Sequence, residues 1–193
     1  MAIITLGITG HRYLAQKEKV MAGVERAIQH VLKTFPASNI RVLSSLAEGA
    51  DRLLAKRLLM VPNACLWVPL PLPEEEYLKD FETPGSKQEF LHLLEKAEQI
   101  IGMPAMDNRE EGYLAAGKYI LEKSDCLLAI WDGKHTQGMA GTGEIVSWAR
   151  ERSLPLAWIH AGNRIPGTDL PISLGRSQGE VTFEHFPPSN RKL

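Results

Sequence analysis

The sequence predicts a doubly wound α/β domain, in which a mainly parallel sheet has helices on both faces. Short apolar runs of strand length alternate with segments whose apolar residues recur every three or four positions. Such alternation is typical of a parallel sheet covered on both faces, and right-handed crossovers then make the sheet doubly wound. With 193 residues, of which 44% are hydrophobic, the chain is long enough for one domain with a sizeable core.

Each expected strand is a short apolar run that ends at a turn signal or at the start of a helical pattern. The expected strands are 3–9, 40–43, 64–69, 99–102, 126–131 and 156–159. Helices are expected where apolar residues recur at helical spacing; Pro36 and Pro62 end the first two, and Asn108 is a suitable cap for the fourth. The expected helices are about 20–35, 46–58, 87–97, 108–123 and 143–152. Residues 69–86 are rich in proline and acid, so we expect a loop that could contain a turn of helix.

The structural signals weaken after His160. Residues 181–186 are expected to add a strand at the edge of the sheet, and the last seven residues are expected to be mobile. We therefore expect a single domain over 1–193, with a core at about 3–160 and a weakly structured C-terminal extension at 161–193.

Composition and charge argue against several classes of function. The net charge of −1 offers no basic field, so nucleic acid is not expected as a partner. No apolar run approaches the roughly 18 residues of a membrane span, and no signal peptide is recognisable. Cys65 and Cys126 lie in apolar runs, where two reduced, buried thiols fit a cytoplasmic protein better than a disulfide does. His and Cys residues show no metal-binding spacing, and neither a metal nor another cofactor is expected.

Three loops that follow strands contain the candidate binding residues. In an open α/β sheet, ligands bind outside the carboxyl ends of the strands, near the point where the strand order reverses. The first loop contains Gly10, His11 and Arg12. Gly10 permits a sharp turn, and the Arg12 guanidinium could bind a phosphate or carboxylate, with a solvated arginine in a simple turn as the alternative. His11 is expected either to contact the ligand or to satisfy backbone groups.

The second loop places small polar residues directly after a strand. Ser44 and Ser45 offer hydroxyl and N–H groups to an anion, and Gly49 allows a ligand to approach the next helix. Ser45 and Glu48 also have the spacing of a capping box, and both roles are compatible. Asp51, on the next turn, is expected either to face ribose hydroxyl groups or to stay solvated. All five are candidate ligand-binding residues.

The third loop, at 138–144, is the most informative. It holds three glycines, which are costly to order and are typical of a special backbone conformation or a close ligand. The order of strand, glycine loop and helix start suits an anion, because the first N–H groups of a helix are free and its dipole is positive there. Gly141, Thr142 and Gly143 are therefore candidate phosphate-binding residues, and Thr142 is also the expected helix cap. Glu144 is either a first-turn residue that suits the dipole or a catalytic acid.

Trp131 ends the strand before this loop and is expected either to stack on a base or to pack in the core. The chain contains neither G-x-x-x-x-G-K-[ST] nor G-x-G-x-x-G, so neither a P-loop nor the ordinary dinucleotide fingerprint is predicted. It also lacks the G-x-S-x-G motif of serine hydrolases.

Four stretches of the sequence together carry a family resemblance. They are Thr9-Gly10-His11-Arg12, Ser44 to Asp51, Leu70-Pro71 with Tyr77 to Phe81, and Ser124-Asp125 with Gly141 to Glu144. These motifs resemble those of the SLOG superfamily, a Rossmann-like group that includes LOG-type phosphoribohydrolases, the DNA-processing protein DprA and nucleotide-sensing domains. The resemblance spans roughly residues 3–160 and implies a nucleotide or nucleotide-derived ligand across the three loops. It does not by itself imply catalysis.

The chain departs from the LOG enzymes at their catalytic positions. Those enzymes carry P-G-G-x-G-T-x-x-E, whereas this sequence keeps Gly141-Thr142 without the leading Pro-Gly-Gly. An ungapped match places Ile145 at the family's catalytic acid and Ala116, with Lys118 nearby, at its arginine. Glu144 is the nearest acid, and a shift of one residue turns a helical side chain by about 100°.

Three functions remain. The first is a sensing or binding protein that holds a nucleotide or nucleotide derivative through its phosphate. The alternative is a nucleoside monophosphate phosphoribohydrolase that cleaves the N-glycosidic bond with Glu144 as its acid. The third, a DNA-associated role like that of DprA, is disfavoured by the neutral charge. The sequence is also compatible with a homo-oligomer.

Overall fold

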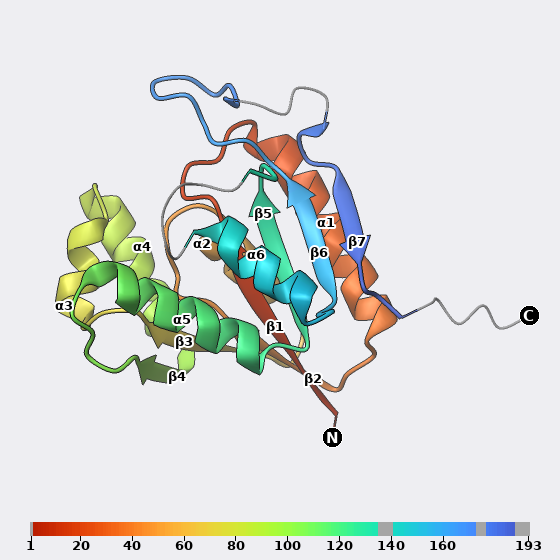
Figure 1. The fold of residues 1–193 in the computed structure, drawn as a ribbon, viewed down its shortest axis with the longest axis horizontal. Helices are drawn as coiled ribbons and strands as arrows, with labels where there is room; N and C mark the ends of the chain where they lie inside the picture. The colour runs from red at the N-terminus through yellow and green to blue at the C-terminus, as the bar shows by residue number, and fades with distance from the viewer. Residues whose placement is uncertain (1, 135–140, 173–176, 188–193) are drawn as a thin grey trace, which may run out of the picture.

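The computed structural model describes residues 2–134, 141–172 and 177–187, which form one seven-stranded sheet with helices on both faces (Figure 1). The strand order is β4-β3-β2-β1-β5-β6-β7, with β1 to β6 parallel and β7 antiparallel to β6. The predicted doubly wound α/β class is therefore confirmed. The strands are β1 (Ile3–Gly10), β2 (Asn39–Leu43), β3 (Ala64–Leu70), β4 (Ala97–Gly102), β5 (Cys126–Trp131), β6 (Leu156–His160) and β7 (Val181–Glu184).

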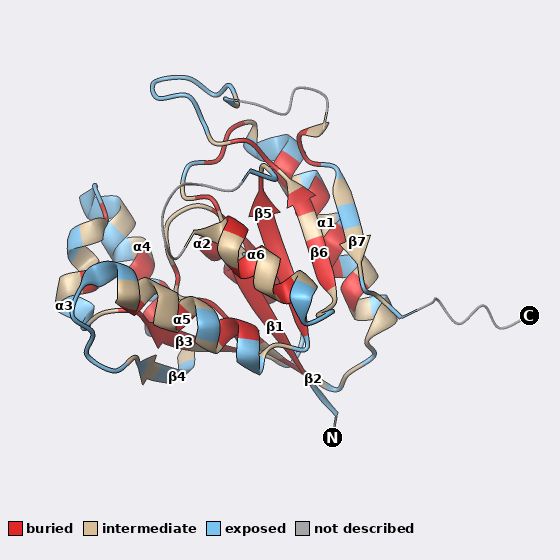
Figure 2. Cartoon of the chain, viewed as in Figure 1, coloured by how far each residue is buried: buried red, intermediate tan, exposed pale blue. Residues whose placement is uncertain are grey.

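Two groups of helices cover the sheet. The buried residues of α1, α2 and α4 pack on one face, and those of α5 and α6 pack on the other. Figure 2 shows the resulting burial, with the central strands almost wholly buried between the two helical layers. The helices are α1 (Lys17–Thr34), α2 (Ala50–Leu58), α3 (Glu74–Tyr77), the 3-10 turn η1 (Leu78–Asp80), α4 (Pro84–Leu94), α5 (Arg109–Lys123) and α6 (Thr142–Glu151).

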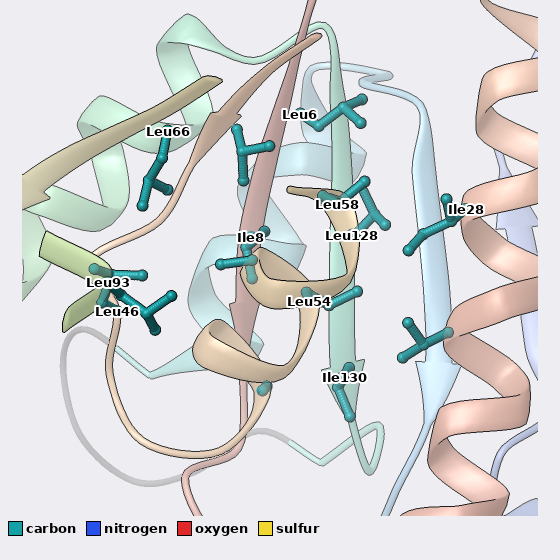
Figure 3. Packing of buried hydrophobic residues seen from close by; sticks show 14 of the residues in the cluster. Leu6, Ile8, Ile28, Leu46, Leu54, Leu58, Leu66, Leu93, Leu128 and Ile130 are labelled. Carbon is teal, nitrogen blue, oxygen red and sulfur yellow. The ribbon is translucent and has the colours of Figure 1, made fainter. Parts of the chain in front are cut away.

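Strand β5 explains why the sequence shows a continuous apolar run at the centre of the sheet. Every residue of this strand is buried. Successive side chains of a strand point to opposite faces, so a strand covered on both sides has no polar alternation. Leu128 and Ile130 join the core beneath α1 and α2, where Figure 3 shows them with Leu54 and Leu58 of α2. Leu127, Ala129 and Trp131 join the second core, beneath α5 and α6.

Helix α2 begins later than predicted. The sequence pattern included Leu46 in its apolar face, but the helix starts at Ala50. Leu46 is fully buried in the preceding loop and has a φ of 57°, in the left-handed region. The apolar pattern placed the helix start too early because it cannot distinguish a buried leucine in a loop from a buried leucine in a helix.

The segment expected to be a loop, 69–86, holds more structure than predicted. It contains α3, η1 and the first turn of α4. Helix α4 begins at Pro84 because the Thr83 side chain accepts a hydrogen bond from the Ser86 N–H and proline suits the first helical position. By contrast, the predicted cap at Asn108 is confirmed, since its side chain accepts from the Glu111 N–H at the start of α5.

The described part of the C-terminal extension returns to the sheet. Residues 181–184 form the predicted edge strand, β7. The buried Gln178 accepts a hydrogen bond from the Gly162 N–H at 2.9 Å and donates one to the Ala15 carbonyl at 2.9 Å. Of the last seven residues, which were expected to be mobile, 188–193 lie outside the described residues. None of the described helices is long and apolar enough to span a membrane.

Gly10, at the end of β1, is required for space rather than for a turn. It does not have a positive φ. A Cβ at this position would lie 2.4 Å from the Ala50 Cβ and 2.6 Å from the Ile130 carbonyl oxygen, so α2 and β5 approach the strand too closely for any side chain.

We therefore predict that Gly10→Ala lowers the free energy of unfolding by about 1–3 kcal/mol, the usual cost of overpacking. Gly102 is the matched control, because it also ends a strand but a Cβ there would have no atom within 4 Å. Chemical denaturation of both alanine variants measures the difference. Equal stability of the two would show that the core around Gly10 adapts to the extra methyl group.

Candidate functional site

The candidate site lies where the strand order reverses. From β1 the chain continues through β2, β3 and β4 toward one edge and then crosses to β5, on the other side of β1. The loops that follow β1 and β5 therefore diverge, and a crevice opens between them. A cleft of about 230 Å³ occupies this place. Its walls come from the end of β1, the β2–α2 loop and helices α2, α3, α5 and α6.

A second hollow of about 310 Å³ adjoins the cleft. Gly10, Arg12 and Thr142 line both. We call the second one the glycine-loop hollow, because the start of α6 contributes to it. Its remaining lining residues are His11, Tyr13, Trp131, Gly141, Gly143 and Asn163. Residues of the first and third predicted loops, far apart in the sequence, thus meet around one site.

Arg12 lies at the junction of the cleft and the hollow. Its guanidinium carbon is 5.6 Å from the centroid of the Tyr113 ring. Within the described ranges, no carboxylate or other acceptor pairs with its side chain. A half-buried guanidinium whose N–H groups are not bonded to a carboxylate is well suited to bind a phosphate or carboxylate.

His11 connects the β1 loop to its neighbours. Its N–H donates to the Ile130 carbonyl at 2.9 Å, and its carbonyl accepts from the Ala50 N–H at 3.0 Å. The buried imidazole accepts from the Asp132 N–H at 3.2 Å through Nε2. Burial lowers the pKa of His11, although the neighbouring Asp132 carboxylate raises it. His11 therefore satisfies backbone groups, one of its two predicted roles, while it also lines the glycine-loop hollow.

The two serines of the second loop have different surroundings. Ser44 is fully buried; its hydroxyl accepts from the Leu46 N–H at 3.1 Å and donates to Asp51 Oδ2 at 3.2 Å. Ser45 lines the cleft and donates its hydroxyl proton to the Pro69 carbonyl at 2.8 Å. The hydroxyl oxygen of Ser45 remains available as an acceptor, whereas Ser44 supports the loop and Asp51.

Asp51 lies in the wall of the cleft rather than in solvent. Only 6% of it is exposed, which excludes the solvated alternative. Burial raises the pKa of Asp51 to about 7, while the Ser44 hydroxyl, the Ala47 N–H and the charges of Arg12 and Arg52 act to lower it. The cleft thus contains a carboxyl group that changes its charge near neutral pH.

The predicted capping box is absent. The N-cap residue of α2 is Gly49, which has no side chain that could cap the helix. The Ser45 hydroxyl is directed to Pro69, and the Glu48 carboxylate accepts a hydrogen bond from the Ser86 hydroxyl at the start of α4. Ser45 and Glu48 thus form hydrogen bonds with β3 and α4 instead of the capping-box hydrogen bonds that their spacing favours.

Gly49 is required by the approach of the β1 loop. Its φ is +79°, and a Cβ would lie 2.2 Å from the Arg12 carbonyl oxygen. Gly49 and Glu48 line a neighbouring hollow toward α4 and do not line the cleft. The contact of Gly49 and Glu48 with a ligand therefore stays a prediction. In the structure, Gly49 packs against the loop after β1, and Glu48 bonds to the start of α4.

Arg52, which the sequence analysis missed, holds the β2–α2 loop in place. This arginine is only 2% exposed; it donates from Nε to the Leu46 carbonyl at 2.9 Å and from Nη1 to the Ser86 carbonyl at 2.8 Å. Its guanidinium carbon is also 4.3 Å from the centroid of the Phe81 ring. An arginine in an amphipathic helix carries no sequence signal for such a role, because most helix arginines are solvated.

The third loop enters the site at the start of α6. Gly141 is the N-cap residue, so Thr142, the predicted cap, is instead the first residue of the helix. Gly141 has no side chain that could cap α6. Thr142 lines both the cleft and the hollow, and Gly141 and Gly143 line the hollow. The remaining residues of the loop, 138–140, lie outside the described residues.

Glu144 and its neighbour face different surroundings. Ile145, at the position where the family resemblance expects an acid, lines the cleft. Glu144 lies in the first turn of α6 and lines neither the cleft nor the hollow. Ala116, at the position of the family's arginine, is buried.

Trp131 packs in the core, which is one of the two roles expected from the sequence. Its side chain is 1% exposed, and its ring centroid lies 5.4 Å from that of Trp158. The indole N–H donates to the Lys134 carbonyl at 2.9 Å. Trp131 still contributes to the wall of the glycine-loop hollow.

Several residues that line the cleft were not predicted as site residues, and three of them carry a hydroxyl or carboxylate on a helix. They are Tyr77 of α3 and Glu110 and Tyr113 of α5. Tyr77 lies in one of the stretches that carry the family resemblance, and this resemblance could have identified it as a candidate site residue. Glu110 and Tyr113 follow no motif, and the packing of α5 against β1, β3 and α6 brings them to the site.

The fold and the site define an α/β protein with a cleft at the switch point of its sheet. Among residues 2–134, 141–172 and 177–187, no group of three His, Cys, Asp or Glu side chains is arranged to hold a metal ion. Comparison of the sequence with models of known protein families and with curated protein sequences finds no match.

The titration of Asp51 predicts a pH-dependent stability. Because its folded-state pKa of about 7 lies above the unfolded value of 3.8, the stability it contributes is present below pH 3.8 and is lost as the pH rises through about 7. Asp51→Asn removes this titration, so the stability of the variant relative to wild type should rise between pH 4.5 and pH 8. The expected change is on the order of 1.4 kcal/mol for each pKa unit.

Urea denaturation at both pH values measures this change. Asp107→Asn is the control, since Asp107 is exposed. A difference between Asp51→Asn and wild type that does not vary with pH would show that Asp51 titrates as an ordinary carboxyl group.

Proposed function

We propose that this protein binds a nucleotide or a nucleotide derivative and acts as a binding or sensing protein. The phosphate would lie in the glycine-loop hollow, beside Arg12 and the start of α6, and the nucleoside would lie in the adjoining cleft. Support comes from the position of both spaces at the switch point of the sheet, where open α/β proteins bind their ligands.

The observation that carries the proposal is the pairing of two anion-binding devices at one junction. Arg12 lines both spaces, and its side chain forms no hydrogen bond or ion pair with a described residue, although its charge acts on Asp51 in the cleft. The start of α6, at Gly141 to Gly143, lines the same hollow, and the N–H groups and dipole of a helix start favour negative charge. The resemblance to the SLOG superfamily supports the same ligand class, as does the mixed aromatic and apolar lining of the cleft.

We predict that Arg12→Ala weakens the binding of a nucleoside 5′-monophosphate by tenfold or more, because a charge-assisted hydrogen bond contributes about 1.5–3 kcal/mol. Binding of the matching nucleoside, which lacks the phosphate, should change little. The melting temperature of the free protein should also change little, since the Arg12 side chain forms no ion pair with a described residue.

Isothermal titration calorimetry with both compounds measures these effects. Arg164→Ala is the control, because Arg164 is exposed and lines only the hollow toward α4. A strong loss of stability in Arg12→Ala, or an equal loss of affinity for nucleoside and nucleotide, would contradict the assignment of Arg12 to the phosphate.

Hydrolysis of the N-glycosidic bond is the alternative function, and one observation favours it. The buried carboxyl group of Asp51 lines the cleft, and its pKa of about 7 is typical of a general acid. Against it, the cleft presents Ile145 where the LOG enzymes carry their catalytic acid.

We therefore predict that the protein releases no free base from AMP, GMP, CMP or UMP, as measured by chromatography of the reaction mixture. Release by wild type that is lost in Glu144→Gln would make Glu144 the catalytic acid and the protein an enzyme. Release that is lost in Asp51→Asn but kept in Glu144→Gln would assign the acid to Asp51 instead.

A further inference from the structure

Tyr77 is a buried cleft residue whose hydroxyl has no partner among the described residues. Its side chain is 1% exposed and lines the cleft. The ring is held edge-on against Phe81 and Phe90, with centroids 5.0 and 5.5 Å apart. Buried tyrosine hydroxyls ordinarily have a partner, so this one is available to a molecule in the cleft.

The Tyr77 hydroxyl can act as a hydrogen-bond donor at any physiological pH. Burial and the nearby Asp51 carboxylate both raise the pKa of Tyr77, so it stays protonated. Its position is fixed by the aromatic contacts and by α3, of which it is the last residue. A donor of this kind does not need to be reorganised when a ligand binds.

Asp51 provides a matching acceptor in the same cleft. The Ser44 hydroxyl donates to its Oδ2 at 3.2 Å, and a carboxylate has further acceptor sites for a second donor. Asp51 comes from α2 and Tyr77 from α3, so tertiary folding places one donor and one acceptor together.

We propose that Asp51 and Tyr77 form a subsite for the two neighbouring hydroxyl groups of a ribose, and that the protein therefore selects ribonucleotides over 2′-deoxyribonucleotides. This inference rests on the proposed function. One ribose hydroxyl donates to the Asp51 carboxylate, and the other accepts from the Tyr77 hydroxyl. A pair of hydroxyl groups fits because it is neutral and can both donate and accept, whereas a second phosphate would be repelled by Asp51 and by Glu110 in the same cleft.

The subsite explains how discrimination would arise. A 2′-deoxyribose lacks one of the two hydroxyl groups, so one buried polar group of the protein stays unpaired in the complex. Sites built to bind a hydroxyl group reject analogues that lack it more strongly than apolar pockets distinguish a methylene group. Arg12 lies in the same cleft and would hold the phosphate of the same ligand.

The test compares AMP, GMP, CMP and UMP with their 2′-deoxy forms by calorimetry on the full chain. We expect the ribose form of the bound nucleotide to bind at least tenfold more tightly to wild type. Of Tyr77→Phe and Asp51→Asn, the variant that removes the partner of the 2′-hydroxyl should reduce this ratio toward one, and the variant that removes the partner of the 3′-hydroxyl should weaken both forms alike. Tyr77→Phe removes a hydroxyl that bonds to no described residue, so this variant should fold as wild type does. Tyr119→Phe is the control, since Tyr119 lies on α5 but does not line the cleft.

The outcomes separate this inference from the proposed function. Equal affinity of wild type for ribose and deoxyribose forms would overturn the subsite and leave nucleotide binding intact. Full discrimination retained in both Tyr77→Phe and Asp51→Asn would also overturn it. If none of the eight compounds binds, the proposed function fails, and the subsite fails with it.

Discussion

The close approach of three segments at the carboxyl end of β1 is the constraint on which the candidate site depends. At Gly10, the start of α2 and the end of β5 leave no space for a side chain. One residue later, the backbone of His11 is hydrogen-bonded to β5 on one side and to α2 on the other. Gly49 meets the same loop from α2. Because the backbone is held on both sides, β5 and the start of α2 together set the position of Arg12 at the junction of cleft and hollow.

The site that results has two ends of different polarity. Arg12 and the start of α6 provide positive potential at the glycine-loop hollow. Tyr77 and Asp51 provide neutral or titrating hydrogen-bonding groups in the cleft. A ligand with an anionic group at one end and a neutral polar group at the other satisfies both ends at once, which is the chemical reason for favouring a nucleotide over a simple anion.

Much of the fold could be predicted from local patterns, because burial on both faces produces apolar runs that are easily recognised. The strand at Cys126–Trp131 and the cap at Asn108 are examples. Local rules failed where tertiary contacts offered better partners: Ser45 and Glu48 have capping-box spacing, but they bond to β3 and α4 instead.

The sequence by itself determined the fold class and the strand-end loops that could form a site. It contained the Thr-Gly-His-Arg and Gly-Thr-Gly motifs and the Ser44-Ser45 loop, which together predicted an anion at the carboxyl edge of the sheet. Only the tertiary structure decided which side chains share the cleft, because α3 and α5 bring Tyr77 and Tyr113 there through packing that leaves no periodic signal. The tertiary structure also decided that Asp51 is buried. Its burial raises its pKa, and the sequence could not predict this because desolvation depends on neighbours distant in sequence.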